Sequence, residues 1–307
     1  MVAKELNKKD NSTLLGILAI LFWGSTVAFS RSLTEQLGVV TTSGLVFISG
    51  GLLSWFYLII RSPHTIKKMI HLPYNYLWGC GFLFVLYMIS LYLAIGLSFN
   101  NQQVIEVSII NYLWPGLTLL FSVPILKKKA YFLIVPGTIL SFAGVYIGMN
   151  PYHSLSIYSF FQNIKNNSLP YILAFIAALS WALYSNLARK WAARDKEGAV
   201  PIFLLITGLL LLILRIFYQE ESRWTIRAGI ELLYMAVFPT FLAYSFWDRA
   251  MRRGNILLVA SLSYFTPLLS VFISSLYLHI TIEVRLWIAS LLVVAGAFLS
   301  RYSISDA

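Results

Sequence analysis

Residues 108–117 read SIINYLWPGL, and this stretch decides how the fold is interpreted. Its surroundings are almost entirely apolar, so we expect it to lie inside a membrane. Yet Asn111, Tyr112, Trp114 and Pro115 stand within five positions of one another. A bilayer tolerates polar groups and broken backbone hydrogen bonds only where protein or a wet cavity surrounds them. The stretch therefore predicts a kinked helix that faces the interior of a helix bundle.

The composition places the chain among membrane proteins. Of its 307 residues, 59% are hydrophobic and 11% are charged, and the mean hydropathy is +0.76. A membrane-spanning helix needs about 20 apolar residues. Ten runs fit this length: 13–30, 43–60, 76–97, 104–126, 131–149, 169–189, 200–217, 230–247, 256–278 and 284–301. The first is expected to be a retained helix and not a signal peptide.

The basic residues predict the orientation of these helices. With the N-terminus in the cytoplasm, the cytoplasmic segments hold 17 Lys and Arg residues and the opposite side holds 6, which accounts for all 23. Cytoplasmic loops of membrane proteins carry such an excess. We therefore expect both termini in the cytoplasm. The net charge of +11 is explained by this asymmetry, and no nucleic-acid partner is expected.

The chain repeats itself at an offset of 152 residues. NYLWPGL at 111–117 is echoed by SYFTPLL at 263–269, and AGVYIG at 143–148 by AGAFLS at 295–300. Each half holds five predicted helices, an odd number, so the second half enters the membrane in the opposite sense. Inverted repeats of this kind are typical of secondary transporters. Chance similarity among apolar helices is the alternative explanation.

The predicted fold class is therefore an all-α membrane protein with ten transmembrane helices in two inverted five-helix repeats. The expected segments are a cytoplasmic N-terminal segment, a first repeat, an external linker, a second repeat and a cytoplasmic tail: 1–12, 13–149, 150–168, 169–301 and 302–307. Gly144 with Gly148, and Gly296 with Ser300, form pairs of small residues four apart. Such pairs let two helices approach closely in lipid.

Aromatic residues are candidates for a binding cavity. Trp23, Trp114 and Trp181 each lie about ten residues from a helix end, close to 15 Å deep at 1.5 Å per residue. Tyr87 and Tyr112 lie at similar depth. Their N–H and O–H groups need partners, so we expect them to face the bundle interior, lining a cavity or packing against each other. Six further tryptophans near helix ends or in a loop are read as interfacial anchors: Trp55, Trp78, Trp191, Trp224, Trp247 and Trp287.

Pro115 and Pro267 are predicted hinges. Each lacks an N–H and deprives the carbonyl four residues earlier of its helical donor. Those carbonyls belong to Asn111 and Ser263, which points polar groups toward an internal cavity. A proline kink that only shapes packing is the alternative.

Charged residues are nearly absent from the predicted spans. Glu106 is placed in a first helical turn, where it complements the helix dipole or, alternatively, couples transport. Asp248 and Arg249 are expected to pair at a cytoplasmic helix end. No ionisable side chain lies at mid-depth to relay a proton or to neutralise a cation. We therefore expect an apolar or aromatic solute whose transport is not strictly coupled to a proton on a cavity side chain.

No catalytic, nucleotide-binding or metal-binding motif was found, so no enzyme activity, catalytic residue, metal or cofactor is expected. A membrane-embedded enzyme acting on lipid would need a cluster of reactive side chains at a helix end. A structural or receptor-like protein would not need an inverted repeat with paired prolines.

The two inverted halves resemble the EamA type of the drug/metabolite transporter superfamily. IEV at 105–107, NYLWP at 111–115 and SYFTP at 263–267 are similar to the bacterial aromatic amino-acid exporters within it. The resemblance implies an inner-membrane exporter of Phe, Tyr, Trp or similar amino acids, whose partners are the solute and the bilayer. It implies a central cavity with helices 5 and 10 as outer supports. It carries a substrate-binding role onto Tyr112, Trp114, Trp181 and Ser263, and also onto Asn111 and Tyr264. An exporter of drugs, nucleosides or other metabolites is the alternative within transport.

Overall fold

The computed structural model describes residues 2–61, 63–149, 157–195, 197–217, 219–278 and 284–305. These residues are almost entirely helical and form two compact units, each of which draws on both predicted halves of the chain. The start of the predicted linker, 150–156, and the end of the predicted tail, 306–307, lie outside the described residues.

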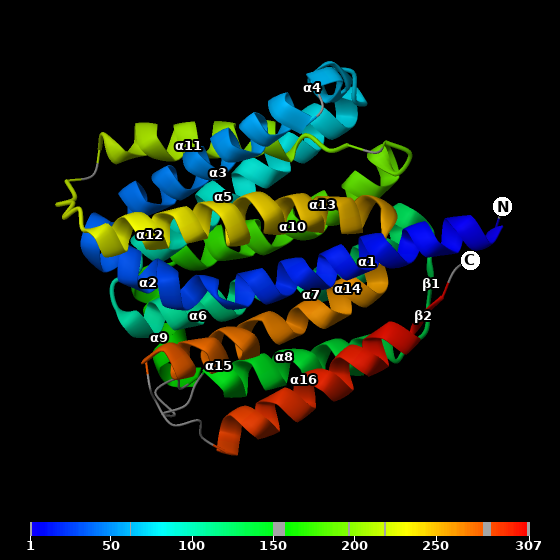
Figure 1. The fold of residues 1–307 in the computed structure, drawn as a ribbon. Coiled ribbons are helices and arrows are strands. Elements are labelled where there is room, and N and C mark those ends of the chain that lie inside the picture. The colour runs from blue at the N-terminus through cyan, green and yellow to red at the C-terminus, as the bar shows by residue number, and fades with distance from the viewer. Residues whose placement is uncertain are drawn as a thin grey trace. The chain divides into compact units, whose positions relative to one another are not determined.

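The first unit comprises residues 1–85 and 187–256. Its helix α3 lies against α11, and α1 lies against α13 (Figure 1). Its elements, which include the π-helices η1 and η2 and the ends of two shared helices, are α1 Val2–Gly24, α2 Thr26–Leu37, α3 Val39–Arg61, α4 Pro63–Ile70, η1 Asn75–Cys80, α5 Gly81–Gly96 in part, α10 Leu169–Ala192 in part, α11 Val200–Arg215, α12 Ile226–Met235, η2 Ala236–Leu242 and α13 Ala243–Arg253.

The second unit comprises residues 86–186 and 257–307. It holds most of α5 and α10, together with α6 Asn101–Asn111, α7 Trp114–Leu126, α8 Ile134–Met149, α9 Ile157–Asn166, α14 Ile256–Leu262, the 3-10 helix η3 Ser263–Phe265, α15 Thr266–Leu278 and α16 Val284–Tyr302. Two-residue strands, β1 Lys129–Ala130 and β2 Ile304–Ser305, pair antiparallel. Helix α9 lies within the predicted linker, and β2 within the predicted tail, so neither segment is irregular throughout.

Helices α8 and α16 pack side by side (Figure 1). A Cβ added at Gly144 would stand 2.7 Å from the carbonyl oxygen of Ala289, and one at Gly137 would stand 2.6 Å from the backbone nitrogen of Ser300. Only glycine allows two backbones to come so near. The close approach predicted from the small residues at 144, 296 and 300 is confirmed.

Each of the ten predicted apolar runs falls on helical structure, but they differ in length. Among the described residues, five helices are long and apolar enough to cross a membrane, or six if the pair Asn11–Gly24 and Thr26–Leu37 counts as one span. Four further apolar helices are shorter: Ile134–Ile147, Val200–Arg215, Ile256–Ser270 and Trp287–Ser300. The structure is therefore that of an all-helical, multi-pass membrane protein.

Several spans are irregular where the sequence predicts a plain helix. The first bends by 41° at Ser25. The third begins with the π-helix η1, and the eighth contains η2 with Pro239 inside it. A proline inside a helix removes one hydrogen bond, and π-turns often occur where the regular pattern is interrupted.

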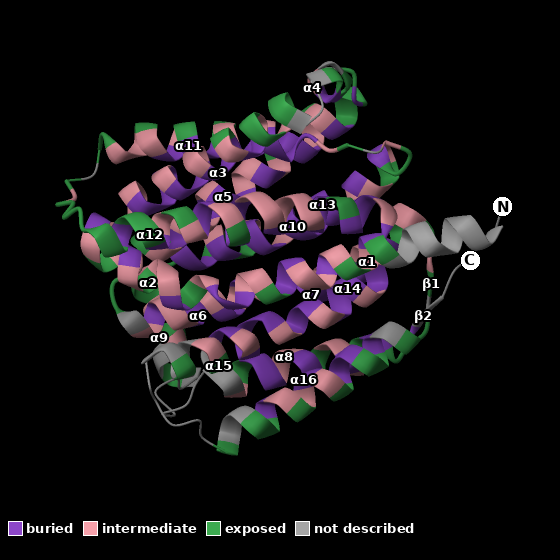
Figure 2. Ribbon diagram, viewed as in Figure 1, coloured by how far each residue is buried: buried purple, intermediate pink, exposed green. Residues whose placement is uncertain are grey.

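The outward faces of the helices are apolar. On α16, Leu291 is 70% exposed and Phe298 is 58% exposed, and on α11 Leu209 is 55% exposed. Figure 2 shows exposed positions recurring along α11 and α16. Large exposed apolar patches mark interaction surfaces, and for helices of this composition the surface fits lipid.

Candidate functional site

The opening stretch interrupts a helix in the second unit, as predicted. Helix α6 ends at Asn111 and α7 begins at Trp114. Between them, the N–H of Leu113 donates to the carbonyl of Ile110 at 3.0 Å, a tighter turn than that of an α-helix. Pro115 lies in the first turn of α7, where its missing N–H costs least. The break therefore coincides with the polar and aromatic positions of the sequence.

Four aromatic side chains meet beside this break. The ring centroids of Tyr87 and Trp181 are 4.6 Å apart, those of Trp114 and Trp181 are 6.4 Å apart in an edge-on arrangement, and those of Trp181 and Tyr184 are 5.0 Å apart and stacked. Trp114, Trp181 and Tyr184 are buried, and Tyr87 is only 9% exposed. Three predicted site residues, Tyr87, Trp114 and Trp181, thus form one cluster from three helices. Tyr184 was not predicted.

The second proline motif breaks its helix in the same way. Helix α14 passes into the 3-10 helix η3 at Ser263 before α15 begins at Thr266, and Pro267 lies in its first turn. The Ser263 hydroxyl is buried and donates to the carbonyl of Ala260 at 2.6 Å. It keeps its oxygen as an acceptor for other groups.

The tyrosines of the two motifs come together. Tyr264 belongs to a buried cluster with Val145 and Leu268, and Tyr112 packs against that cluster. A Cβ added at Gly116 would stand 2.5 Å from the Tyr264 hydroxyl. Gly116 therefore admits this hydroxyl, and any larger residue there would displace it.

Two buried amide oxygens have no hydrogen-bond partner among the described residues. They are Oδ1 of Asn111, a residue 7% exposed, and Oδ1 of Asn186, which is fully buried. The Asn186 amide nitrogen donates to the carbonyl of Thr118 at 2.9 Å, which fixes the direction of the side chain. A buried acceptor without a donor is costly, so these oxygens are suited to a ligand N–H. Asn186 was missed by the sequence analysis, although a lone amide in the sixth apolar run was a usable signal.

The dipole interpretation of Glu106 is wrong. Asn100 caps α6, its side chain accepting from the N–H of Gln103 at 2.8 Å, so the helix begins a turn earlier than predicted. Glu106 therefore lies beyond the first turn, 3% exposed. Its carboxylate accepts hydrogen bonds from the Tyr171 hydroxyl and, at 3.2 Å and 3.3 Å, from the Asn163 amide. It joins α6 to α9 and α10.

Trp23 belongs to the first unit and not to the cluster around Trp181. Its indole N–H donates to the carbonyl of Pro239 at 3.0 Å, and its ring lies 5.2 Å from the ring of Trp247. Trp247 is fully buried, so its prediction as an interfacial anchor is wrong. Its position near a helix end said nothing of the face of the helix on which it lies.

The predicted pairing of Asp248 with Arg249 is also wrong. Asp248 pairs with Arg252, whose Nε lies 2.8 Å from Oδ2, and each side chain is 2% exposed. Arg249 is exposed. Residues one apart point away from each other on a helix, whereas residues four apart lie on one face.

No group of three or more metal-binding side chains occurs in the described parts of the chain. The Ser263 carbonyl, predicted to be freed by Pro267, accepts instead from the backbone N–H of Thr266. The chemistry available in the second unit is therefore aromatic contact together with amide and hydroxyl hydrogen bonding. Such a set can bind a solute.

The sequence model of the EamA-like transporter family matches residues 11–149 and again residues 168–302. The aromatic amino acid exporter YddG of Escherichia coli (strain K12) is 33% identical over 292 residues, which cover 95% of this chain and 97% of that protein. The protein of the same name from Salmonella typhimurium (strain 14028s / SGSC 2262) is 31% identical over 94% of this chain and 96% of its own length. An uncharacterized transporter of Bacillus subtilis (strain 168), YvbV, is 28% identical over 95% and 92%. One solved crystal structure matches with a TM-score of 0.79 at 25% identity, covering 94% of this chain and 97% of that chain.

Proposed function

Because the chain belongs to the EamA-like transporter family, we propose that it is an exporter of aromatic and other apolar amino acids in the bacterial inner membrane. It works by alternating access, as a secondary transporter and not as an enzyme. The substrate class is supported by the names of two relatives that are each more than 30% identical over nearly their full length.

The observation that carries this proposal is the aromatic cluster of Tyr87, Trp114 and Trp181 beside the helix break. Indole and phenol rings offer flat apolar faces, and aromatic pairs contribute about 0.5–1.5 kcal/mol beyond area burial. An aromatic solute gains this term and a small one does not. Trp114 and Trp181 are accordingly the proposed walls of the substrate site.

Polar groups near the break would meet the other end of the amino acid. The Asn111 amide oxygen and the carbonyl freed by Pro115 are acceptors for an ammonium group. The hydroxyls of Tyr112 and Ser263 are further candidates, with Tyr264 as a more distant lining position. Pro115 and Pro267 would then be the hinges at which α7 and α15 change direction.

The inverted repeat of ten helices is supported by the pairing of helices within each unit. Helix α3 packs on α11, and α8 packs on α16. In the predicted numbering these are helices 2 with 7 and 5 with 10, which hold equivalent places in the two halves. A two-fold axis in the membrane plane brings equivalent helices together in this way. We place both termini in the cytoplasm.

Coupling to protons does not require a mid-depth carboxylate in this proposal. Glu106 and Asp248 are candidates for coupling from the ends of the spans, and Glu106 would act through its hydrogen bonds to Asn163 and Tyr171. A Glu106→Gln variant should retain transport down a phenylalanine gradient. Uptake that needs a pH gradient in the original protein and loses that need in the variant would assign coupling to Glu106.

Proteoliposome transport tests the substrate class. Trp181→Ala and Trp114→Ala should each lower transport of labelled phenylalanine relative to labelled alanine by about twofold to tenfold, the range of one lost aromatic contact. Trp287→Ala is the control, because Trp287 is 63% exposed on α16 and should leave the ratio unchanged. Equal losses for both solutes in correctly folded Trp181→Ala protein would mean that Trp181 only packs the bundle.

A further inference from the structure

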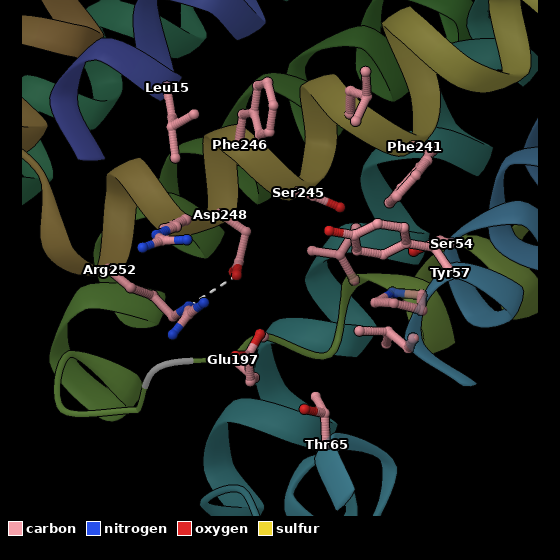
Figure 3. Close-up of a pocket in the computed structure, with 16 residues that line it drawn as sticks. Leu15, Ser54, Tyr57, Thr65, Glu197, Phe241, Ser245, Phe246, Asp248 and Arg252 are labelled. Atoms are coloured by element: carbon pink, nitrogen blue, oxygen red, sulfur yellow. Dashed lines mark hydrogen bonds and ion pairs between the residues drawn. The ribbon is translucent and has the colours of Figure 1, made fainter. Parts of the chain in front are cut away.

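The first unit contains a pocket of about 480 Å³ that is lined only by its own residues. Pockets that bind small molecules have volumes of roughly 300–1,000 Å³. Elements α1, α3, α4, η2, α13 and the loop before α11 contribute to its walls. Figure 3 shows Tyr57 and Phe241 on one side of the pocket and Asp248 and Arg252 on the opposite side.

Asp248 and Arg252 form one wall of the pocket, where their opposite charges cancel and hydrogen bonds hold both side chains in place. Asp248 Oδ2 lies 2.8 Å from Arg252 Nε, and Asp248 Oδ1 accepts from the Tyr76 hydroxyl at 2.8 Å. The Arg252 guanidinium also donates to the carbonyl of Asp195 at 2.6 Å. A Cβ on Gly198 would collide with the Asp248 carboxylate, so a glycine is needed where the loop passes this wall. Since buried charges are tolerated when they are paired in this way, a ligand's own charges must be met elsewhere.

The rim supplies charges of both signs. Glu197 and Arg249 line the pocket and are exposed to solvent. Three hydroxyl residues from three different helices, Ser54, Thr65 and Ser245, also line the pocket. The pocket therefore offers one anionic and one cationic side chain, which suits a ligand that carries charges of both signs.

The remaining lining is apolar and aromatic. The rings of Tyr57 and Phe241 are 5.7 Å apart and form one face. Leu15 and Phe246 extend the apolar lining (Figure 3). Such faces favour a flat apolar group, because aromatic rings gain from edge and face contacts with one another.

We propose that this pocket binds an amino acid with a large apolar side chain as a zwitterion. Glu197 receives the ammonium group, Arg249 receives the carboxylate, and the side chain lies against the face formed by Tyr57 and Phe241. Resting on the proposed function and its topology, the pocket is a second binding site at the cytoplasmic ends of α3 and α13, where solute is collected before export. The headgroup of phosphatidylethanolamine carries the same pair of charges, so the test must separate the two sources.

Protection of an introduced cysteine tests the proposal in the purified full-length protein. Ser245→Cys is made in a Cys80→Ala background, since Cys80 is the single cysteine of the chain, and its rate of reaction with N-ethylmaleimide is measured. Phenylalanine at ten times its Kd should slow the reaction by about tenfold. Adding Glu197→Gln and Arg249→Gln should raise the phenylalanine concentration for half protection by about twofold to thirtyfold, the product of two exposed charge contacts. Gln219→Cys, on an exposed loop of the same unit, is the control for reagent effects.

A Trp181→Ala background separates this pocket from the site in the second unit. Protection of Ser245→Cys by phenylalanine should persist there, although phenylalanine transport falls. Loss of protection in that background would place the ligand at the Trp181 site and overturn the proposal. The proposal would also be overturned if phosphoethanolamine protected Ser245→Cys and phenylalanine did not, or if phenylalanine protected Gln219→Cys as strongly as Ser245→Cys. If the original protein transports phenylalanine but phenylalanine does not protect Ser245→Cys, the second site alone is refuted. Protection without phenylalanine transport instead refutes the proposed function and leaves the pocket as a binding site.

Discussion

Asp248 and Arg252 form a buried ion pair, whereas Arg31 and Glu35 form an exposed one at the same four-residue spacing. The side chains of the first pair are each 2% exposed, and those of the second are 71% and 65% exposed. In water an ion pair adds little, because solvent already stabilises each charge. In a buried site the loss of one partner leaves the other charge without solvent or counter-charge.

Asp248→Asn should therefore destabilise the protein far more than Glu35→Gln. Breaking a buried pair costs about 3–5 kcal/mol, whereas an exposed helical pair contributes about 0.3–0.5 kcal/mol. The free energy of unfolding, measured by denaturant titration in detergent without added amino acid, checks the difference. Similar values for the two variants would show that water reaches the Asp248 site.

At this scale the sequence predicted which aromatic residues cluster, but it did not predict every residue that faces inward. Tyr87, Trp114 and Trp181 were placed at mid-depth, and three helices do bring them together. Trp247 was assigned to the interface because it lies near the end of an apolar run, yet it is fully buried. Hydropathy measures position along the helix axis, and only packing against neighbours decides which face turns inward.

At the scale of the helix, the two proline motifs were predictable because proline acts through its own missing N–H. The bend at Ser25 and the π-helix η1 contain no proline and leave hydropathy unchanged, so they were not predicted, whereas Pro239 inside η2 was a signal that the sequence analysis missed. The start of α6 was missed for a related reason. The polar run at 100–103 looked like a loop, but Asn100 caps the helix and Gln103 already lies within it.

The packing of α8 on α16 gives a test in which one substitution has opposite effects at two sites. A Cβ at Gly296 would collide with the backbone nitrogen of Ser141, while one at Gly229 in α12 meets nothing within 4 Å. Gly296→Ala should force the helices apart and lower stability. Gly229→Ala should raise stability by about 0.5–1 kcal/mol, because alanine loses less backbone entropy in a helix.

Thermal unfolding of both variants in the same detergent gives the comparison. A stabilised Gly296→Ala protein would show that α8 and α16 do not meet closely at this point.

A loop carboxylate caps α3 and makes stability depend on pH. Burial raises the pKa of Glu220, but hydrogen bonds from the N–H groups of Val40 and Thr41 and from the Thr41 hydroxyl, with Arg215 nearby, lower it to a net value below the ordinary one. Gly38, at φ +88, turns the chain next to this carboxylate. A depressed pKa means that the folded state holds the proton more weakly than the unfolded state.

Glu220 should accordingly stabilise the protein fully above its unfolded pKa of about 4.3 and lose that contribution as pH falls through its lower folded pKa. Glu220→Gln should lower the midpoint of thermal unfolding at pH 7 and reduce its decline on acidification. The neighbouring Glu221, whose side chain is 92% exposed and 3.9 Å from Arg223, is the matched control. An equal effect of Glu221→Gln would assign the pH dependence to general charge and not to the cap.

At the scale of the whole molecule, the two sequence halves and the two compact units are different divisions of the chain. Each unit combines helices from both halves. The sequence could predict the halves from their repeated motifs, because a repeat is recorded in the order of residues. It could not predict the units, which depend on contacts between helices far apart in the chain, such as α3 with α11.

The same helices could cross the membrane ten times or six times, and the two arrangements place some loops on opposite sides. Ten crossings place Lys165, after the fifth span, outside the cell and Arg194, after the sixth, inside it. Six crossings count only the long spans and the bent first pair, and they omit the span at 134–147. Lys165 then lies inside the cell and Arg194 outside it. The excess of basic residues favours ten, because Arg189, Lys190, Arg194 and Lys196 then share a cytoplasmic loop.

Single cysteines in the Cys80→Ala protein distinguish these arrangements in intact cells. With ten crossings, Lys165→Cys should react with an impermeant thiol reagent added outside, and Arg194→Cys should react only after the cells are opened. Lys128→Cys, after the fourth span, is cytoplasmic in both arrangements and controls for leakage of the reagent. The reverse labelling of Lys165→Cys and Arg194→Cys would remove the short helix at 134–147 from the membrane. The first half would then hold four crossings, an even number, and the second half could no longer be inverted with respect to it.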